Sequence, residues 1–395
     1  MDEYDAVVLG AGAAGLMAAM AAGRGGRRVL VLDHAPHAGA KILISGGGRC
    51  NFTNTGTVPE RFLSANPHFA RSALARFTPR HFLDLVEKHR IPWHEKTLGQ
   101  LFCDRSARDI VAMLLDECAA AGVELRTGTR VIEVTKSDRF RVETSRGTVL
   151  ARALVLATGG LSIPKMGATG FSLDLARRFG LRLTETRPGL VPLTFEGEAL
   201  ALMRPLSGVA LPAVARTGKA AFPEAVLFTH RGLSGPAILQ ISSYWRPGEA
   251  ISLDLLPGQD PAALLLERKK ARPRAEPRTV LAEFLPQRLA QALAEAWLPD
   301  AEMANQTDKA LRGVAERLRA LPLTPSGTEG YAKAEVMLGG VDTRDLSSRS
   351  LEAKAVPGLF VVGEAVDVTG WLGGYNFQWA WASGWCAGEA IATRD

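Results

Sequence analysis

The chain contains only four cysteines in 395 residues and has no long uninterrupted apolar run. The cysteines show no C-x-x-C spacing, which is unlike a disulfide-rich scaffold and indicates a reducing, cytoplasmic compartment. No apolar segment approaches the roughly 20 residues that span a bilayer, so we expect no membrane-spanning helix and no membrane partner. Asp2, Glu3 and Asp5 have the wrong charge for a secretory signal, which also favours the cytoplasm.

The composition is that of a globular protein with more than one domain. Hydrophobic residues make up 47% of the chain and charged residues 22%, unlike the proportions of disordered or fibrous chains. The length suggests two or three domains. The net charge of +6 suits either an anionic partner or a phosphate-bearing cofactor.

The N-terminal segment has the pattern of a dinucleotide-binding unit, in which a buried strand, a glycine turn and an alanine-rich helix follow one another. In this pattern Gly10 permits a sharp turn, Gly12 lets a pyrophosphate approach the backbone, and Gly15 lets the helix pack on the strand. A second strand, 28–33, ends in Asp33 at the spacing that holds an adenosine ribose hydroxyl. Together these features predict a dinucleotide site.

The segment 39–54 has three successive glycines beside serine, arginine, cysteine and asparagine. Such a run is a poor helix or strand but a good loop for surrounding a ligand with main-chain N–H groups. Lys41 and Arg49 add positive charge, which suits a phosphate or an anionic ring. Because residues 42–44 are apolar and would anchor the segment, we favour a ligand loop over a flexible surface loop.

A buried strand returns after a β-meander. Three alternating segments, 130–135, 139–144 and 148–151, predict the meander, and the apolar segment 153–158 predicts a parallel strand. This order is found in two-dinucleotide-fold flavoproteins and is absent from simple Rossmann dehydrogenases.

The composition changes at residue 188, where short segments separated by proline and glycine begin. We predict an inserted cap domain over 188–330, mostly β over 188–257 and mostly helical over 258–330. The flanking segments 1–187 and 331–395 then form one domain.

A basic run at 268–278 lies within the predicted insert. No aromatic residue interleaves with it to stack bases, as proteins that bind single strands require. We therefore interpret it as a solvated loop and do not favour nucleic acid as a partner.

Six motifs spread over nearly the whole chain carry a resemblance to a known family: Gly10–Gly15, Lys41–Asn51, Gly160–Gly170, Phe228–Pro236, Gly363–Asp367 and Gly373–Asn376. In them the chain resembles the YhiN/BaiN-like bacterial flavoproteins, also labelled NAD(P)/FAD-dependent or aminoacetone-oxidase-family oxidoreductases. The resemblance implies noncovalently bound FAD and an α/β fold. Its FAD domain would be a Rossmann-like two-dinucleotide fold of the succinate dehydrogenase and fumarate reductase flavoprotein type, with an inserted β-barrel plus helical domain. FAD enzymes more often have glutamate where this chain has Asp33, which has a shorter reach.

The C-terminal part returns to the flavin. Residues 358–364 predict a buried strand that ends in Gly363-Glu364, where FAD enzymes commonly bind the ribityl chain. A helix is predicted over 377–391, and its first N–H groups would stabilise a reduced flavin ring that lies in front of them. We expect Gly374 to let the backbone approach that ring.

The residues that we predict to bind FAD are Gly10, Gly12, Ala13, Ala14, Gly15, Asp33, His34, Lys41, Ser45, Gly46, Gly48, Arg49, Cys50, Asn51, Val131, Thr158, Gly159, Gly160, Gly363, Glu364, Gly374, Tyr375, Asn376 and Phe377. No residue is assigned to a metal.

Four residues are catalytic candidates. Arg49 can hold an anionic substrate, Cys50 can place a thiol at the ring, and Tyr375 or His230 can transfer a proton. Packing roles are at least as consistent with the sequence for Cys50, as a small core residue, and for His230, as a residue between domains.

The sequence leaves three functions open. The first is a reductase that passes hydride from reduced flavin to a C=C or C=O bond of a small organic substrate. The second is an oxygen-dependent oxidase of a small amine, and the third is a flavoprotein with a non-enzymatic or RNA-linked role. No second Gly-x-Gly-x-x-Gly unit follows a strand, so NAD(P)H, as electron donor, would approach the flavin only transiently, or another donor would replace it. The oligomeric state is left open.

Overall fold

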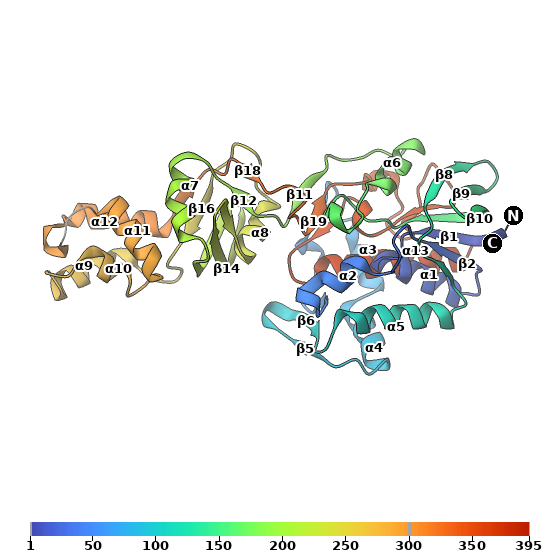
Figure 1. Cartoon of the computed structure of the whole chain (residues 1–395), viewed down its shortest axis with the longest axis horizontal. Helices are drawn as coiled ribbons and strands as arrows, with labels where there is room; N and C mark the ends of the chain where they lie inside the picture. Colours follow the sequence, from blue (N-terminus) through green and yellow to red (C-terminus); the bar gives the residue numbers. More distant parts are fainter. Residues whose placement is uncertain (1, 299–301, 395) are drawn as a thin grey trace. The chain divides into compact units, whose positions relative to one another are not determined.

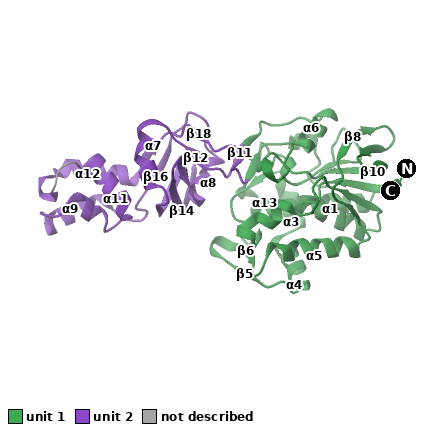
Figure 2. Cartoon of the chain, viewed as in Figure 1, with its two compact units in different colours: residues 1–187, 336–395 green, residues 188–335 purple. Residues whose placement is uncertain are grey.

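The computed structural model describes residues 2–298 and 302–394. The chain divides into two compact units, residues 1–187 together with 336–395, and residues 188–335 (Figure 2). Two short strands lie at the boundaries, β11 (Arg187–Gly189) and β19 (Val336–Leu338).

The second boundary lies five residues later than the predicted one, at 335 in place of 330. The N–H of Glu335 donates to the carbonyl of Leu190 at 3.2 Å. This hydrogen bond ties the end of the segment to the start of the insert.

The first unit is organised around a seven-stranded sheet in the order β7-β2-β1-β10-β9-β8, with β20 paired to β10. Pairing is parallel among β7, β2, β1, β10 and β20 and antiparallel among β8, β9 and β10. The strands are β1 (Asp2–Leu9), β2 (Val29–Leu32), β7 (Glu124–Arg126), β8 (Val131–Lys136), β9 (Phe140–Thr144), β10 (Gly147–Leu156) and β20 (Leu359–Val361) (Figure 1).

Strands β1 and β2 form the buried centre of this sheet. Residues 6–9 pair in register with residues 29–32, and their side chains are at most 2% exposed. Continuous apolar runs of this kind are what parallel strands covered on both faces require. Both strands end at the same edge, where Gly10 and Asp33 directly follow.

Strand β10 is longer than the sequence predicts. In place of two strands over 148–151 and 153–158, Gly147–Leu156 is one continuous strand. Its first half pairs with β9 and its second half pairs with β20. Arg152 is exposed at the changeover, so the charged residue marks a change of partner and not the end of a strand.

The helices of the first unit include two that lie side by side, α1 and α13 (Figure 1). A β-carbon at Gly384 would lie 2.3 Å from the carbonyl oxygen of Ala14, and one at Gly388 would lie 2.4 Å from that of Ala18. The two glycines therefore let the helix backbones approach closely. Because the later glycine of α13 faces the later alanine of α1, the two helices run in the same direction. The helices are α1 (Ala13–Arg24), α2 (Ala40–Ile44), α3 (Ala70–Arg76), α4 (Pro79–Lys88), α5 (Ala107–Ala120), α6 (Phe171–Arg178) and α13 (Tyr375–Ala392).

Small sheets connect the middle of the first unit to α13. They are formed by β3 (Asn51–Asn54), β6 (Gln100–Cys103) and β5 (Trp93–Glu95), and by β4 (Phe62–Leu63) and β21 (Thr369–Gly370). The hydroxyl of Thr53 donates to Oε1 of Gln378 at 2.6 Å, and the indole N–H of Trp381 donates to the carbonyl of Phe52 at 2.8 Å. Strand β3 is thereby held against the last helix.

The second unit contains a seven-stranded antiparallel sheet in the order β17-β16-β13-β14-β15-β12-β18. Its strands are β12 (Leu193–Thr194), β13 (Ala210–Thr217), β14 (Ala220–Thr229), β15 (Gly232–Ser234), β16 (Ile251–Asp254), β17 (Leu321–Leu323) and β18 (Gly327–Thr328). The sequence predicts a β-barrel here; the hydrogen-bonded order is a single sheet with β17 and β18 at its ends. The helices are α7 (Gly197–Met203), α8 (Pro236–Ser242), α9 (Pro261–Ala271), α10 (Pro277–Leu281), α11 (Gln287–Trp297) and α12 (Asp308–Arg319).

The basic run 268–278 is partly helical and largely ion-paired, in contrast to the solvated loop that the sequence predicts. Helix α9 continues to Ala271. Arg268 pairs with Glu283 and Lys269 pairs with Asp308, each at 2.7 Å. These acidic neighbours reduce the positive charge that the run presents to solvent.

Glu117 joins three helices of the first unit. It lies in α5, its side chain is 5% exposed, and it pairs with Arg24 of α1 and with Lys88 and His89 at the end of α4. Burial by itself would raise the pKa of this carboxyl, but the three cationic neighbours outweigh burial and lower the pKa to about 2.

Replacing Glu117 with glutamine should lower the free energy of unfolding by about 2 kcal/mol at neutral pH, because the partly exposed cations lose their common partner. The folded-state pKa lies below the ordinary 4.5, so the stabilisation is present above pH 4.5 and is lost as the pH falls toward 2. Urea denaturation should separate wild type and variant at pH 7 and not at pH 2. The control is Glu60→Gln, which removes an exposed partner of Arg71. Equal stability of Glu117→Gln and wild type at pH 7 would contradict the assignment.

Candidate active site

The glycine turn between β1 and α1 places three glycines in three different environments. Gly10 has φ +109°, and a β-carbon there would lie 2.4 Å from the carbonyl oxygen of Ala157. A β-carbon at Gly15 would lie 1.9 Å from the carbonyl oxygen of Gly10, so the start of α1 requires glycine. At Gly12 a β-carbon would meet no atom within 4 Å. The turn thus leaves open space beside Gly12 at a helix N-terminus, which is the arrangement that binds phosphate.

Asp33 connects this turn to the loop after β2. Its Oδ2 accepts the N–H of Ala11 at 2.7 Å, and its Oδ1 accepts the N–H of Ala35 at 2.8 Å. Each oxygen of an ionised carboxylate has a second lone pair. The side chain can therefore accept a ribose hydroxyl without losing its backbone partners.

Two further predicted residues lie beside Asp33. The N–H of Thr129 donates to the carbonyl of Asp33 at 2.8 Å, which brings the start of β8 and Val131 to this edge. The exposed His34 lies against Gly167, where a β-carbon would be 2.7 Å from its Nε2.

Glu364 is the centre of a polar network. Its Oε1 accepts the hydroxyl of Ser162 at 2.7 Å and the N–H of Met337 at 2.8 Å, and its Oε2 accepts Nζ of Lys41 at 2.7 Å and the N–H of Gly160 at 3.2 Å. Nζ of Lys41 also donates to Ser162 at 2.7 Å. Burial raises the pKa of Glu364, but Lys41 and the other donors outweigh it and hold the pKa below its ordinary value.

The network changes the role of Lys41. The sequence predicts that Lys41 faces a phosphate or an anionic ring, yet its ammonium group is shared by Glu364 and Ser162. A part-buried carboxylate needs a cation, and Lys41 supplies it. The ion pair therefore fixes Glu364 in place beside Gly159 and Gly160, where a β-carbon at Gly159 would lie 3.5 Å from the carboxylate.

The segment that the sequence predicts as a ligand loop begins as a helix. Residues 40–44 form α2, in which Ile42 is 1% exposed and anchors the segment. Ile44 is 46% exposed, so only part of the apolar run is buried. The loop itself is confined to Ser45 and the residues after it, and the hydroxyl of Ser45 donates to the carbonyl of Ile42 at 2.8 Å.

The three glycines after Ser45 all have left-handed backbones. Their φ angles are 56° for Gly46, 67° for Gly47 and 85° for Gly48. A β-carbon at Gly46 would lie 2.8 Å from the ring of Phe102, whereas Gly47 and Gly48 face open space. The loop thus rests on Phe102 and presents bare backbone on its other side.

Arg49 and Cys50 point to different environments. The guanidinium of Arg49 is exposed and forms no ion pair with any residue in 2–298 or 302–394. Cys50 is fully buried at φ 51°, and burial raises the pKa of its thiol far above the ordinary value. This is the environment of a packed, protonated thiol, which was one of the two alternatives for Cys50, and it weakens the catalytic one.

The turn before α13 faces β3. Gly374 has φ +97°, and a β-carbon there would lie 2.4 Å from the carbonyl oxygen of Thr53. Asn54 donates to the carbonyl of Gly373 at 2.8 Å, and the amide of Asn51 lies 2.9 Å from Gln100. The sequence assigns the space at Gly374 to a flavin ring; the structure fills it with the backbone of β3.

The first residues of α13 are held by their own side chains. The hydroxyl of Tyr375 accepts a hydrogen bond from Arg61. The amide of Asn376 accepts the N–H of Gly370 at 2.8 Å and donates to its carbonyl at 2.9 Å. Phe377 stacks on Trp381 with ring centroids 5.5 Å apart, which is a packing contact.

The structure therefore brings the predicted residues of the first unit into two adjoining groups. The first group surrounds the glycine turn, and the second lies where the glycine loop, β3 and α13 meet. Glu364 with Lys41 links them. His230 belongs to the second unit, where it is exposed in the turn between β14 and β15.

Sequence reasoning missed several side chains in these groups. Ser162 lies inside the motif 160–170 and was detectable there. Arg61 and Gln378 carry no local pattern, because their partners Tyr375 and Thr53 are more than 300 residues away in the chain.

Residues 4–390 match the family described as HI0933-like protein Rossmann domain. The chain belongs to this family. An Escherichia coli (strain K12) protein named ribosomal RNA dihydrouridine synthase is 51% identical over 400 residues, covering 100% of both chains. A Clostridium scindens protein named 3-dehydro-bile acid delta(4,6)-reductase is 31% identical over 415 residues and covers 98% of both. Neither name supports the aminoacetone-oxidase label of the sequence resemblance.

A solved structure shows the fold of the HI0933-like family. The 3-ketosteroid-delta4-(5alpha)-dehydrogenase of Rhodococcus jostii RHA1 aligns with a TM-score of 0.52 at 17% identity, covering 100% of this chain and 97% of that one. The fold is the Rossmann-like FAD-binding α/β fold, and the family is one of FAD-type oxidoreductases, as the sequence predicts. Among residues 2–298 and 302–394, no helix combines the length and apolarity that crossing a membrane requires.

Proposed function

We propose that this chain binds FAD noncovalently and reduces uridine in ribosomal RNA to dihydrouridine. The observation that carries the proposal is the 51% identity, from end to end, with the E. coli protein of that name. The site geometry supports it, because the glycine turn, Asp33 and Glu364 have the form of an FAD site.

The residues fit FAD part by part. The open space beside Gly12 suits the pyrophosphate, and the carboxylate of Asp33 suits the adenosine ribose. Glu364 is held ionised by Lys41, and four donors occupy its two oxygens, so its role toward the ribityl chain would be to position the backbone at Gly160 and Met337. FAD, when bound and reduced, supplies the hydride that C6 of the uracil ring requires.

The remaining hydrogen is a proton, which must reach C5 of the same ring. Tyr375 is the candidate donor, since its hydroxyl is oriented by Arg61 at the start of α13. Burial does not separate Tyr375 from Cys50, since their exposures are 3% and 0%; Cys50 is less suited because burial raises the pKa of its thiol and makes it a weaker acid. Arg49 is the candidate for an RNA phosphate, since its exposed guanidinium has no acidic partner among the described residues.

The proposal selects among the three functions that the sequence leaves open. It combines the reductase function, in which reduced flavin passes hydride to a C=C bond, with the link to RNA that was part of the third function. The name of the E. coli relative describes formation of a reduced base, and the name of the C. scindens relative describes a reductase. The electron donor that we propose is NAD(P)H, which meets the flavin transiently.

The test is a dihydrouridine assay. Ribosomal RNA is prepared from an E. coli strain in which the gene for the 51% identical relative is deleted. The RNA is incubated with the FAD-loaded protein and NAD(P)H and digested, and the masses of its fragments are measured by mass spectrometry. We expect a gain of two hydrogens at uridine, dependent on both protein and NAD(P)H. An unmodified RNA together with rapid flavin reduction by a small amine would overturn the proposal in favour of an oxidase.

Arg49→Gln should weaken binding of ribosomal RNA. The slope of the logarithm of the binding constant against the logarithm of the salt concentration should become shallower by about one. FAD content and flavin reduction by NAD(P)H are measured on the same variant, because the sequence also predicts Arg49 as an FAD-binding residue. Lys136→Gln removes a cation at the end of β8 and is the control. A salt dependence identical to wild type would show that Arg49 contacts no phosphate.

A further inference from the structure

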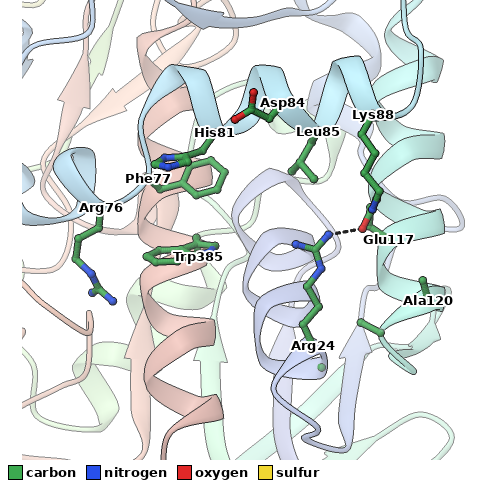
Figure 3. Close-up of a pocket in the computed structure, with 12 residues that line it drawn as sticks. Arg24, Arg76, Phe77, His81, Asp84, Leu85, Lys88, Glu117, Ala120 and Trp385 are labelled. Carbon is green, nitrogen blue, oxygen red and sulfur yellow. Dashed lines mark hydrogen bonds and ion pairs between the residues drawn. The ribbon is translucent and has the colours of Figure 1, made fainter.

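A pocket of about 800 Å³ lies among the helices of the first unit, apart from every residue assigned above to FAD or to catalysis (Figure 3). It is lined by the end of α1, by α4, by α5 and by the middle of α13. A volume of this size is typical of sites for small molecules and cofactors. The FAD site described above does not include any residue of this pocket.

One side of the pocket is aromatic (Figure 3). The ring of Phe77 lies 5.6 Å from His81 and 5.8 Å from Trp385. The guanidinium of Arg76 lies over Trp385 at 5.1 Å and donates to the carbonyl of Arg349 at 2.7 Å, and no carboxylate pairs with it within the described part of the chain. Rings and a cation in this arrangement are suited to stacking a planar base.

Trp385 differs from the other tryptophans of α13. Trp379 and Trp381 are at most 1% exposed, and their indole N–H groups donate to backbone carbonyls. Trp385 is only partly buried, and among residues 2–298 and 302–394 its N–H has no acceptor. A large ring at a pocket wall with an unused donor is suited to a ligand more than to the core.

His81 adds a second donor on the same side. Its Nδ1 accepts the N–H of Thr78 at 2.9 Å, so in the neutral ring the proton is on Nε2. The histidine that caps α4 therefore presents an N–H that can meet a carbonyl of a base.

The opposite side of the pocket is cationic (Figure 3). Arg24 and Lys88 converge on the single carboxylate of Glu117, which His89 also contacts. The other acid at the pocket, Asp84, is paired with Arg80. Two cations share one anion, so a net positive charge is left for an anionic ligand.

We propose that this pocket binds a nucleoside monophosphate unit, with its base against Trp385 and His81, behind which the buried Phe77 packs, and its phosphate near Arg24 and Lys88. The unit is either a free nucleotide or an unpaired nucleotide of an RNA strand, which present the same chemistry. The proposal goes beyond the proposed function; it rests on FAD binding but not on dihydrouridine formation, because it concerns a second place on the FAD-loaded protein.

The test is calorimetric titration of full-length, FAD-saturated protein, since saturation blocks binding of nucleotides at the adenosine side of the cofactor site. The probes are UMP, AMP, uridine, inorganic phosphate and a short single-stranded oligouridine. We expect both nucleotides to bind more tightly than uridine or phosphate. Trp385→Leu should weaken nucleotide binding roughly tenfold, as loss of one stacked base does, and Lys88→Gln should weaken UMP more than uridine.

The controls are Trp297→Leu and Lys309→Gln in the second unit, which should not change binding. Circular dichroism and flavin absorbance show that each variant is folded and holds FAD. Binding of UMP and oligouridine identifies the shared unit, and binding of oligouridine alone identifies an RNA strand. The proposal is overturned if no probe binds, or if binding is unchanged in both Trp385→Leu and Lys88→Gln. Neither result depends on whether the protein forms dihydrouridine.

Discussion

Replacing Gly12 with valine should give a folded protein that no longer holds FAD. A β-carbon at this position meets no protein atom within 4 Å, and the backbone at φ −88° is accessible to any residue. The added side chain therefore costs the protein itself little. It fills the space that we assign to the pyrophosphate, and a steric conflict of this kind should weaken FAD binding by roughly 100-fold.

The measurement compares absorbance near 450 nm with absorbance at 280 nm, together with the melting temperature of the FAD-free protein. Gly313→Val is the matched control, because Gly313 lies in α12 of the second unit and its β-carbon also meets open space. We expect the control to be yellow and Gly12→Val to be colourless with an unchanged apo melting temperature. A yellow Gly12→Val protein would show that the pyrophosphate does not lie at this turn.

The parts of the candidate site whose backbone geometry can be predicted from the sequence are local in the chain. Gly10, Gly12 and Gly15 lie within six residues, and a turn, a strand end and a helix start each impose a residue type at a fixed spacing. Asp33 follows from the length of one helix and one strand. Short-range geometry of this kind is encoded in the pattern itself.

The parts that the sequence does not predict depend on pairing over long distances. Lys41 and Glu364 are 323 positions apart, and Arg61 and Tyr375 are 314 apart. Each residue alone is compatible with a ligand, and only the fold shows that a protein partner satisfies it. For this reason the sequence indicates a phosphate or an anionic ring for Lys41, whereas in the fold its charge pairs with the part-buried carboxylate of Glu364.

Strand β10 shows a second kind of limit. A charged residue at Arg152 separates two apolar segments, and the pattern indicates two strands. The chain continues straight because only the neighbouring strand changes, from β9 to β20. The hydrophobic pattern indicates which residues are buried, but it does not indicate which neighbouring strand pairs with each part of a strand.

Replacing Gly374 with valine should destabilise the fold itself, in contrast to the change at Gly12. Its φ of +97° is unfavourable for any residue with a side chain, and a β-carbon would lie 2.4 Å from the carbonyl oxygen of Thr53. The collision is with backbone of β3, which cannot rotate away as a side chain can. Strain and overpacking together should lower the free energy of unfolding by about 3 kcal/mol or more.

Gly122→Val separates the two contributions. Gly122 follows α5 with φ +69°, but a β-carbon there meets no atom within 4 Å, so this variant carries the backbone strain without the collision. Urea denaturation should place Gly374→Val clearly below Gly122→Val, and Gly122→Val moderately below wild type. If Gly374→Val were as stable as Gly122→Val, the start of α13 would not be packed on β3, and the space at Gly374 would again be available for the flavin ring that the sequence assigns to it.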